Sequence, residues 1–409
     1  MKILKILAIA LATACVGGFS PLAAAHGERA QMPQVRMRTV HWFDVTVSAT
    51  KLDVNQILVV KGSFIPSDFW PTQFPSAEET AFLNIGVPGP SFVRLDSRVN
   101  GVPMIRSTSF HPELQYNFEI TLKARKPGRY HIHPVINVKD TGPLIGPGLW
   151  VEIGGDQAAF TNTAKTLLGQ DIDLESFGYA NAVHWSILWA VVGVAWFVWW
   201  LLRVPIILPR FRRAAELGAN ADQMITLGDR RVALGFLVLT LSLIVGGYMY
   251  ADDKWPITTA LQAGKIAAPP AQRPAVPLDV RMNEARYRIP GRSFRVALTV
   301  TNRGSSPVTV GELDAGNVRF VNSSVLQVKP ADADDLVASD ALHVDGGPVA
   351  PGETRDIVVY ADDALWETER MTTMIDSPDA IVAVMLFFYD GDGKRYPVEV
   401  GGPMIPVFG

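Results

Sequence analysis

Two long apolar segments near the middle of the sequence restrict this chain more than any other feature. Neither the first, 182–202, nor the second, 232–250, contains Asp, Glu, Lys or Arg. A helix of about 20 residues is roughly 30 Å long, enough to cross the hydrocarbon core of a bilayer. Neither segment has the polar face that a surface helix of a soluble domain needs. We therefore predict two transmembrane helices, with a pair of buried core helices as the weaker alternative.

The charges beside these segments predict their orientation. The loop 203–231 has an arginine excess, made of Arg203, Arg210, Arg212, Arg213, Arg230 and Arg231 against Glu216, Asp222 and Asp229. Short loops with such an excess stay in the cytoplasm. The two large flanking regions, 26–178 and 278–409, are then expected in the periplasm, with 251–277 as a linker.

The first 25 residues have the pattern of an export signal. Lys2 and Lys5 precede an apolar stretch, and Ala23-Ala24-Ala25 offers a small-residue cleavage site. Cleavage there makes His26 the first residue of the mature chain. The single cysteine, Cys15, lies in the signal, so the mature chain has neither disulfides nor thiolate metal sites. Acylation of Cys15 is the less favoured interpretation, because Ala12-Thr13-Ala14 lacks the usual upstream aliphatic residue.

Both exported regions show the alternation of β-structure. Short apolar–polar runs separated by Gly and Pro turns are typical of a β-sandwich or barrel. The expected strands are 35–47, 57–64, 92–95, 116–123 and 129–138 in the first region, and 293–302, 317–321, 354–360, 381–389 and 395–400 in the second. Asp390-Gly391-Asp392-Gly393 lacks the ligand spacing of an EF-hand and is predicted to be a hairpin turn.

Three histidines form a candidate metal site. His131 and His133 are two residues apart on an expected strand, so their side chains project from the same face. An H-x-H pair alone is a weak signal, because most such pairs pack or lie on surfaces. A terminal His26, however, offers both an amino and an imidazole nitrogen. This all-nitrogen set suits copper, although three histidines and a water also describe a catalytic zinc site.

The remaining histidines and the composition give no support for other kinds of functional site. His41 is expected to be a core histidine, His111 a turn residue, and His184 an interfacial residue or a contact with a partner helix. A blue-copper site needs a thiolate, which the mature chain lacks. The sequence shows no Ser-His-Asp or Cys-His arrangement and no phosphate-binding glycine loop. A net charge of −3 gives no reason to expect nucleic acid as a partner.

Ordered segments along the whole mature chain resemble the B subunit of the copper membrane monooxygenases, the family that includes particulate methane monooxygenase and ammonia monooxygenase. The segments that carry the resemblance are HGERAQ at 26, RMRTVHWFDV at 36, AFLNIGVPGPSFVR at 81, LKARKPGRYHIHPVINV at 122, GPLIGPGLW at 142, LQAGKI at 261, PGETRDIVV at 351 and GGPMIPVFG at 401.

This resemblance implies a fold and a set of partners. The fold is mainly β, with two cupredoxin-like periplasmic domains of the sandwich or barrel type and two transmembrane helices. Assembly with an A and a C subunit, as a trimer of heterotrimers in a bacterial inner or intracytoplasmic membrane, is implied as well. The implied reaction inserts one oxygen atom of O2 into methane or ammonia, and the copper that catalyses it lies in this chain or in a partner.

The resemblance also implies metal ligands. His26, His131 and His133 match the copper ligands of the family's B subunit. A weaker second site at His41 is implied for some members, paired with a glutamine at the position of Glu399. A carboxylate therefore replaces the amide here.

Two other functions fit the histidines. The first is a membrane-tethered periplasmic copper carrier, which would bind and release copper alone. The second is a scaffold whose copper is structural. Co-purification with A and C subunits would distinguish an enzyme subunit from a carrier. The motifs do not determine the substrate.

Overall fold

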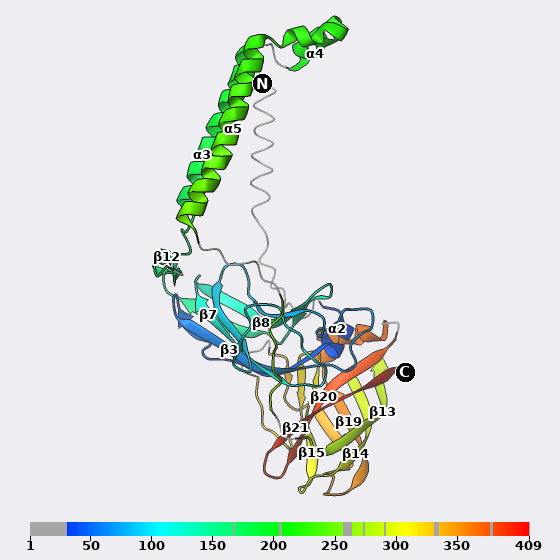
Figure 1. Cartoon of the computed structure of the whole chain (residues 1–409). Helices are drawn as coiled ribbons and strands as arrows, with labels where there is room; N and C mark the ends of the chain where they lie inside the picture. The colour runs from blue at the N-terminus through cyan, green and yellow to red at the C-terminus, as the bar shows by residue number, and fades with distance from the viewer. Residues whose placement is uncertain are drawn as a thin grey trace, which may run out of the picture. The chain divides into compact units, whose positions relative to one another are not determined.

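The computed structural model describes residues 31–408, apart from 167, 204–206, 257–263, 273–274, 290–291, 331–334 and 377–378. The predicted signal 1–25 and His26 therefore lie outside the described residues. The chain divides into two compact units (Figure 1). One unit, Met1–Phe160 with Ala263–Gly409, holds two β-lobes, and the other, Thr161–Gln262, holds the long helices.

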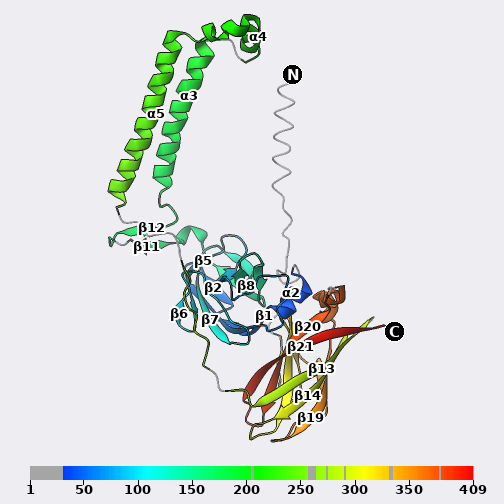
Figure 2. The ribbon, with the colours of Figure 1, turned by 45° about the vertical axis from the view of Figure 1, so that its right-hand side comes forward.

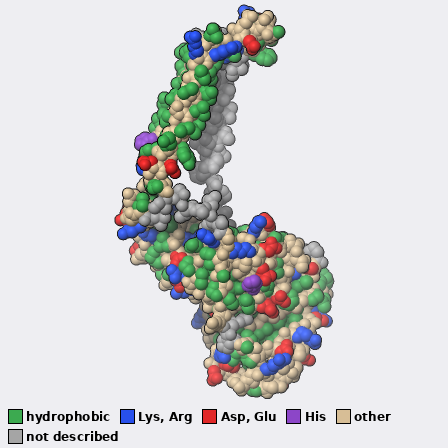
Figure 3. Space-filling model, viewed as in Figure 1, with side chains coloured by type: hydrophobic (Ala, Val, Ile, Leu, Met, Phe, Trp, Pro, Cys, Tyr) green, Lys and Arg blue, Asp and Glu red, His purple; other side chains and the backbone are tan. Residues whose placement is uncertain are grey.

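Within the helical unit, two described helices are long and apolar enough to cross a membrane. They are α3 (Tyr179–Arg203) and α5 (Leu227–Lys254), which run side by side (Figure 2). The Trp196 and Phe236 rings join them, with centroids 5.1 Å apart. Figure 3 shows their surface covered mostly by hydrophobic side chains. The mainly β prediction with two long apolar helices is confirmed.

Both helices extend beyond the predicted apolar segments, because polar residues begin and end them. Helix α5 starts with a capping box in which Thr226 and Asp229 exchange side-chain-to-backbone hydrogen bonds of 3.2 and 2.9 Å. The other elements of this unit are β11 (Thr163–Lys165), β12 (Asp171–Asp173), α4 (Ile207–Leu217) and η3 (Gly218–Met224).

The first β-lobe, called the N-lobe, comprises the described residues 31–160. Its strands form two facing sheets, ordered β1-β3-β7-β5-β6 and β2-β10-β8-β4, with β9 paired to β8. Apolar side chains of both sheets share one core. The strands are β1 (Val40–Val47), β2 (Lys51–Asp53), β3 (Ile57–Pro66), β4 (Ala81–Gly86), β5 (Phe92–Val99), β6 (Val102–Pro103), β7 (Tyr116–Ala124), β8 (Gly128–Val138), β9 (Gly142–Ile145) and β10 (Leu149–Gly154); η2 (Gln157–Ala159) follows them.

The second β-lobe, called the C-lobe, is a sheet ordered β17-β16-β15-β20-β21-β13-β14-β19-β18. Strand β21 pairs antiparallel with β20 along its first part and parallel with β13 along its last part, which joins two halves around one core. The elements are β13 (Leu278–Ile289), β14 (Ser293–Asn302), β15 (Val308–Ala315), β16 (Val318–Val321), β17 (Val337–Ala338), β18 (Leu342–Asp345), β19 (Thr354–Asp362), α6 (Leu365–Thr368), η4 (Met371–Asp376), β20 (Ile381–Asp390) and β21 (Arg395–Phe408).

One predicted strand begins wrongly. Residues 35–38 belong to helix α2 (Pro33–Arg38), and β1 starts only at Val40. Pro33 pre-sets the first helical turn. Tertiary contacts then favour the helix over the alternating pattern, because Met37 lies in the core of the C-lobe and Arg36 is buried beside it.

The two lobes of this unit are joined mainly by α2 and β1. Arg36 donates to the backbone carbonyls of Gly316 at 2.6 Å and of Glu369 at 3.0 Å. The Phe43 and Phe387 rings pack edge to face with centroids 5.6 Å apart. The segment that leads into the C-lobe also binds the N-lobe, since Ile266 N donates to Ser107 O at 2.8 Å. The lobes therefore share a polar and apolar interface.

Candidate metal site

His131 and His133 lie next to each other on one face of β8. Their ring centroids are 4.5 Å apart, and the rings are nearly perpendicular, at 80°. Strand β8 is paired with β10 along its first half and with β4 and β9 along its second half. The backbone is therefore held by β10 at His131 and by β4 at His133. The structure thus brings together the two histidines that the sequence singled out.

A backbone carbonyl orients His133. Its Nδ1 lies 3.1 Å from the carbonyl oxygen of Gly146, and the ring is buried. Since a carbonyl can only accept, Nδ1 carries the hydrogen, and the neutral ring has its lone pair on Nε2. This is the arrangement that metal-binding histidines ordinarily show: one nitrogen donates to a protein oxygen and the other binds the ion.

An aromatic side chain supports His131. Trp150 lies on β10 directly opposite His131 on β8, and the two rings stack at 29° with centroids 4.6 Å apart. The guanidinium of Arg129 lies 4.0 Å from the centre of the Trp150 ring. This stack restricts the rotation of the His131 ring.

The loop Gly146-Pro147-Gly148 packs against both histidines. A Cβ at Gly148 would lie 2.7 Å from Cε1 of His133 and would overlap the His131 ring. A Cβ at Gly146 would lie 2.7 Å from Cγ of Pro134 and 2.9 Å from Cδ2 of Trp42. The sequence indicated a turn here but missed its contact with the histidines, although two glycines flanking a proline were a usable signal.

The donors fit a metal that accepts imidazole nitrogen, such as copper or zinc. Within the part of the chain that the structure describes, no group of three or more His, Cys, Asp or Glu side chains is placed to hold an ion. The pair therefore needs a further ligand. The predicted third ligand, His26, lies outside the described residues.

The first described residue is tied to this region. The Gln31 side chain accepts a hydrogen bond from the backbone N–H of Ile145 at 3.0 Å and donates to the carbonyl of Pro143. Ile145 directly precedes Gly146, whose carbonyl orients His133. The chain five residues after His26 is thus anchored to β9, the strand that leads into the loop 146–148, which we call the histidine loop.

The structure also brings together His41 and Glu399, one from each lobe. His41 Nε2 is 2.8 Å from Glu399 Oε1, and the carboxylate also accepts from the Ser67 hydroxyl and, at 3.0 Å, from Asp68 N. Burial lowers the pKa of His41, but the charge and hydrogen bond of Glu399 outweigh it and raise the pKa above the ordinary value. This geometry is that of an ion pair between the lobes, and a second metal site at His41 stays a prediction.

The other histidines lie at the surface or on a long helix. His111 Nδ1 is 2.9 Å from Glu78 Oε1 in an exposed pair, as expected of a turn residue. His343 forms an exposed pair of 3.0 Å with Asp345, and His184 lies on α3. None of them is joined to the His131–His133 pair by any hydrogen bond, ion pair or ring contact described in the structure.

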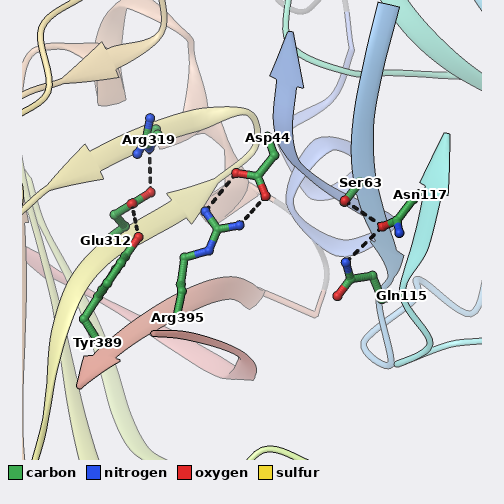
Figure 4. Close-up of polar contacts among 8 residues, drawn as sticks. All are labelled: Asp44, Ser63, Gln115, Asn117, Glu312, Arg319, Tyr389 and Arg395. Atoms are coloured by element: carbon green, nitrogen blue, oxygen red, sulfur yellow. Dashed lines mark hydrogen bonds and ion pairs between the residues drawn. The ribbon is translucent and has the colours of Figure 1, made fainter. Parts of the chain in front are cut away.

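A cavity of about 420 Å³ lies between the two lobes, and Gly148 and Leu149 form part of its wall. Several of the charged groups around it are joined in pairs and small networks, which Figure 4 shows: Asp44 with Arg395, and Glu312 with Arg319 and with the Tyr389 hydroxyl. The cavity therefore combines apolar walls, which include Trp42, Phe43 and Phe387, with charged groups that are partly paired within the protein.

Comparison with known proteins agrees with the residues above. A family model that describes the monooxygenase B-subunit protein matches residues 27–408. The chain is 40% identical to the particulate methane monooxygenase alpha subunit of Methylococcus capsulatus (strain ATCC 33009 / NCIMB 11132 / Bath) over 411 residues, which cover 100% of this chain and 98% of the relative.

Solved structures show a fainter likeness. The cupredoxin domain of amoB from Nitrosocaldus yellowstonii matches with a TM-score of 0.24 and 18% identity, covering 30% of this chain and 92% of that domain. The sequence relationship is far stronger, because it spans the histidine loop, both lobes and both long helices. On that relationship, the chain belongs to the family of monooxygenase B subunits.

Proposed function

We propose that this chain is the copper-binding B subunit of a membrane-bound monooxygenase that uses O2 to convert methane to methanol or ammonia to hydroxylamine. The observation that carries the proposal is the His131–His133 pair, whose rings are adjacent and oriented by the Gly146 carbonyl and by Trp150. Membership of the B-subunit family supports the reaction class, and the name of the 40%-identical relative favours methane.

His26 is the proposed third ligand, and Gln31 supports it. An extended chain spans at most about 3.3–3.6 Å per residue, so five residues reach roughly 17 Å. Gln31 is bound to Ile145, one residue before the loop that packs on both histidines. A mature chain that begins at His26 therefore has enough length to return its amino and imidazole nitrogens to the pair.

The protein's own contribution is to hold the ligands. Bound copper would supply the redox chemistry that O2 needs, whether the substrate is oxidised at this ion or at one in a partner chain. The hydrogen bond from Nδ1 keeps the lone pair of His133 on Nε2, and the Trp150 stack keeps His131 in one orientation. Both effects lower the cost of organising the site when the ion binds.

The arrangement in the cell follows from the same proposal. The long apolar helices would cross a bacterial inner or intracytoplasmic membrane, and both lobes would face the periplasm. The family relationship implies further subunits, which we propose to be an A and a C subunit in a trimer of heterotrimers. These partners and O2 would complete the active complex.

Replacing the histidine pair tests the proposal. The double variant His131→Ala/His133→Ala should lose copper while the complex still assembles, and His111→Ala, an exposed histidine in the same lobe, should retain it. Copper content, co-purifying subunits and turnover would be measured separately. Unchanged copper content in the double variant would refute the ligand assignment. Full turnover after copper loss would leave a scaffold role, and isolation as a stable monomer would favour the carrier.

A further inference from the structure

A hairpin of the C-lobe touches the strand that leads into the histidine loop of the N-lobe. We infer that Asn317, at the tip of this hairpin, is a positioning residue that sets the orientation of His133 from the opposite lobe. The inference rests on the proposed copper function, but it concerns a residue that the histidine motif does not contain.

The hairpin between β15 and β16 presents Asn317 in a rigid form. Ala315 and Val318 are paired, so Gly316 and Asn317 form a two-residue turn, and both have positive φ, at 57° and 71°. Such a turn needs glycine or asparagine, because other side chains are strained there. Asn317 is 5% exposed, and its Nδ2 donates to the backbone carbonyl of Ile145 at 2.9 Å.

The N-lobe holds the same hairpin from a second direction. Arg36 Nη2 donates to the carbonyl of Gly316 at 2.6 Å, and the Arg36 side chain is fully buried. Each of the two turn residues is therefore bonded to the N-lobe, Gly316 to Arg36 and Asn317 to Ile145. Asn317 acts from a backbone that cannot easily move away.

One peptide group transmits this contact toward the histidine. The Ile145 carbonyl and the Gly146 N–H belong to the same planar peptide unit. Asn317 binds the carbonyl end of that unit, and the N–H end donates to Pro134 O at 2.8 Å. The plane is thus fixed at both ends, and the next carbonyl, of Gly146, is the acceptor for His133 Nδ1.

Loss of the Asn317 bond would release one end of this plane. The Gly146 carbonyl could then rotate away from Nδ1, and both the tautomer and the ring orientation of His133 would be less well defined. Outer partners that orient a metal-binding histidine typically contribute about 10- to 100-fold in affinity. Asn317 does not bond to His133 itself but to the peptide unit before the Gly146 carbonyl, so we expect roughly the lower end of that range.

Adhesion between the lobes is a separate role that other contacts fulfil. Arg395 and Asp44 form an ion pair across the interface, and Arg38 pairs with Asp379 at 2.6 Å. None of these contacts involves the strand that leads into the histidine loop. A variant of Asp44 therefore weakens adhesion without touching the peptide between Ile145 and Gly146.

The test uses the full complex in detergent, stripped with a chelator and titrated with Cu(II) ions. Asn317→Gly removes the amide and keeps the positive φ. Its matched control is Asn55→Gly, because Asn55 also has a positive φ, 74°, and donates to a distant carbonyl, that of Ala159, at 2.7 Å. Asp44→Asn is the control for adhesion. Affinity and the electron paramagnetic resonance spectrum would be taken as differences from the His131→Ala/His133→Ala complex.

We expect Asn317→Gly to bind Cu(II) about tenfold more weakly and with altered nitrogen hyperfine features, while both controls match the unaltered protein. Equal affinity and equal spectra for Asn317→Gly and the unaltered protein would overturn the inference. If the glycine variant does not accumulate, Asn317→Asp removes the same donor at nearly equal volume. A histidine double variant that still shows the full copper signal would instead defeat the proposed function.

Discussion

Gly148 and His131 lie so close together that residue 148 cannot carry a side chain while His131 keeps its position. The Cβ of an alanine there would overlap the imidazole of His131 and approach Cε1 of His133 to 2.7 Å. Real Cβ atoms essentially never come so near, so either the loop or the rings would have to move.

Gly148→Ala should therefore reduce copper binding without unfolding the chain. Gly148 is not among the residues with positive φ, so alanine suits its backbone. We expect a loss of affinity of at least about tenfold, as for a disturbed ligand shell. The control is Gly391→Ala in the turn between β20 and β21, where an added Cβ meets nothing within 4 Å. Equal copper content in the two variants would contradict the steric argument.

Arg36→Met should destabilise the two-lobe unit strongly. The side chains of Arg36 and Glu369 are 0% and 1% exposed and lie 3.3 Å apart. Removing one partner of a buried pair costs about 3–5 kcal/mol, because the other charge remains buried. Adding Glu369→Gln to Arg36→Met should recover part of that loss. Thermal denaturation of the three proteins measures this, and a double variant no more stable than the single one would refute it.

Glu399→Gln should lower stability most near pH 5–6. Burial raises the pKa of Glu399, but His41, Ser67 and Asp68 N together lower it below 4.5. The ionised Glu399 therefore stabilises the folded state above about pH 4.5, and this stabilisation disappears in stronger acid. The pKa of His41 is raised above 6.5, so the protonated His41 stabilises the folded state below about pH 6.5. This stabilisation is lost as the pH rises through the raised value. The two contributions overlap between these limits. We expect a cost of about 2 kcal/mol there, and a smaller one at pH 8.5, measured as melting temperatures.

Asp314→Asn should become increasingly stabilising as the pH rises. Burial raises the pKa of Asp314 from 3.8 to about 7, although His41 and Arg319 oppose that effect. Between these values the folded state retains a proton that the unfolded state has lost, so the stability of the unaltered protein falls with rising pH. Asparagine has no such proton. Relative to pH 4, the variant should gain about 2–4 kcal/mol by pH 8. A stability difference that does not change with pH would contradict this account.

The proposed terminal ligand can be tested directly on the mature chain. Amino-terminal sequencing should begin at His26. Inserting one glutamine between Ala25 and His26 leaves the Ala23-Ala24-Ala25 cleavage site in place, so export should stay intact while the histidine loses its amino nitrogen. Copper affinity should then fall about tenfold or more. A different natural terminus, or an unchanged affinity after the insertion, would remove His26 from the site.

Sequence periodicity was sufficient wherever one rule dominates. The apolar segments predicted α3 and α5, because a continuous apolar segment satisfies all its backbone hydrogen bonds in a bilayer by forming a helix. Alternation predicted β14 at 293–302, and the period of two placed His131 and His133 on one face. It missed β13, although residues 278–283 alternate apolar and polar side chains. It missed β15 because the buried Glu312, which pairs with Arg319 on β16, interrupts the apolar pattern.

By itself, then, the sequence determined the two long apolar helices, the mainly β flanks, the family and the adjacent histidine pair, since each depends on local pattern or on ordered motifs. Only the tertiary structure decided that 33–38 is a helix, that Glu399 meets His41, and that Asn317 reaches Ile145. Those residues are separated by up to 358 positions in the chain. Their contacts arise from the packing of one lobe against the other, which no local periodicity encodes.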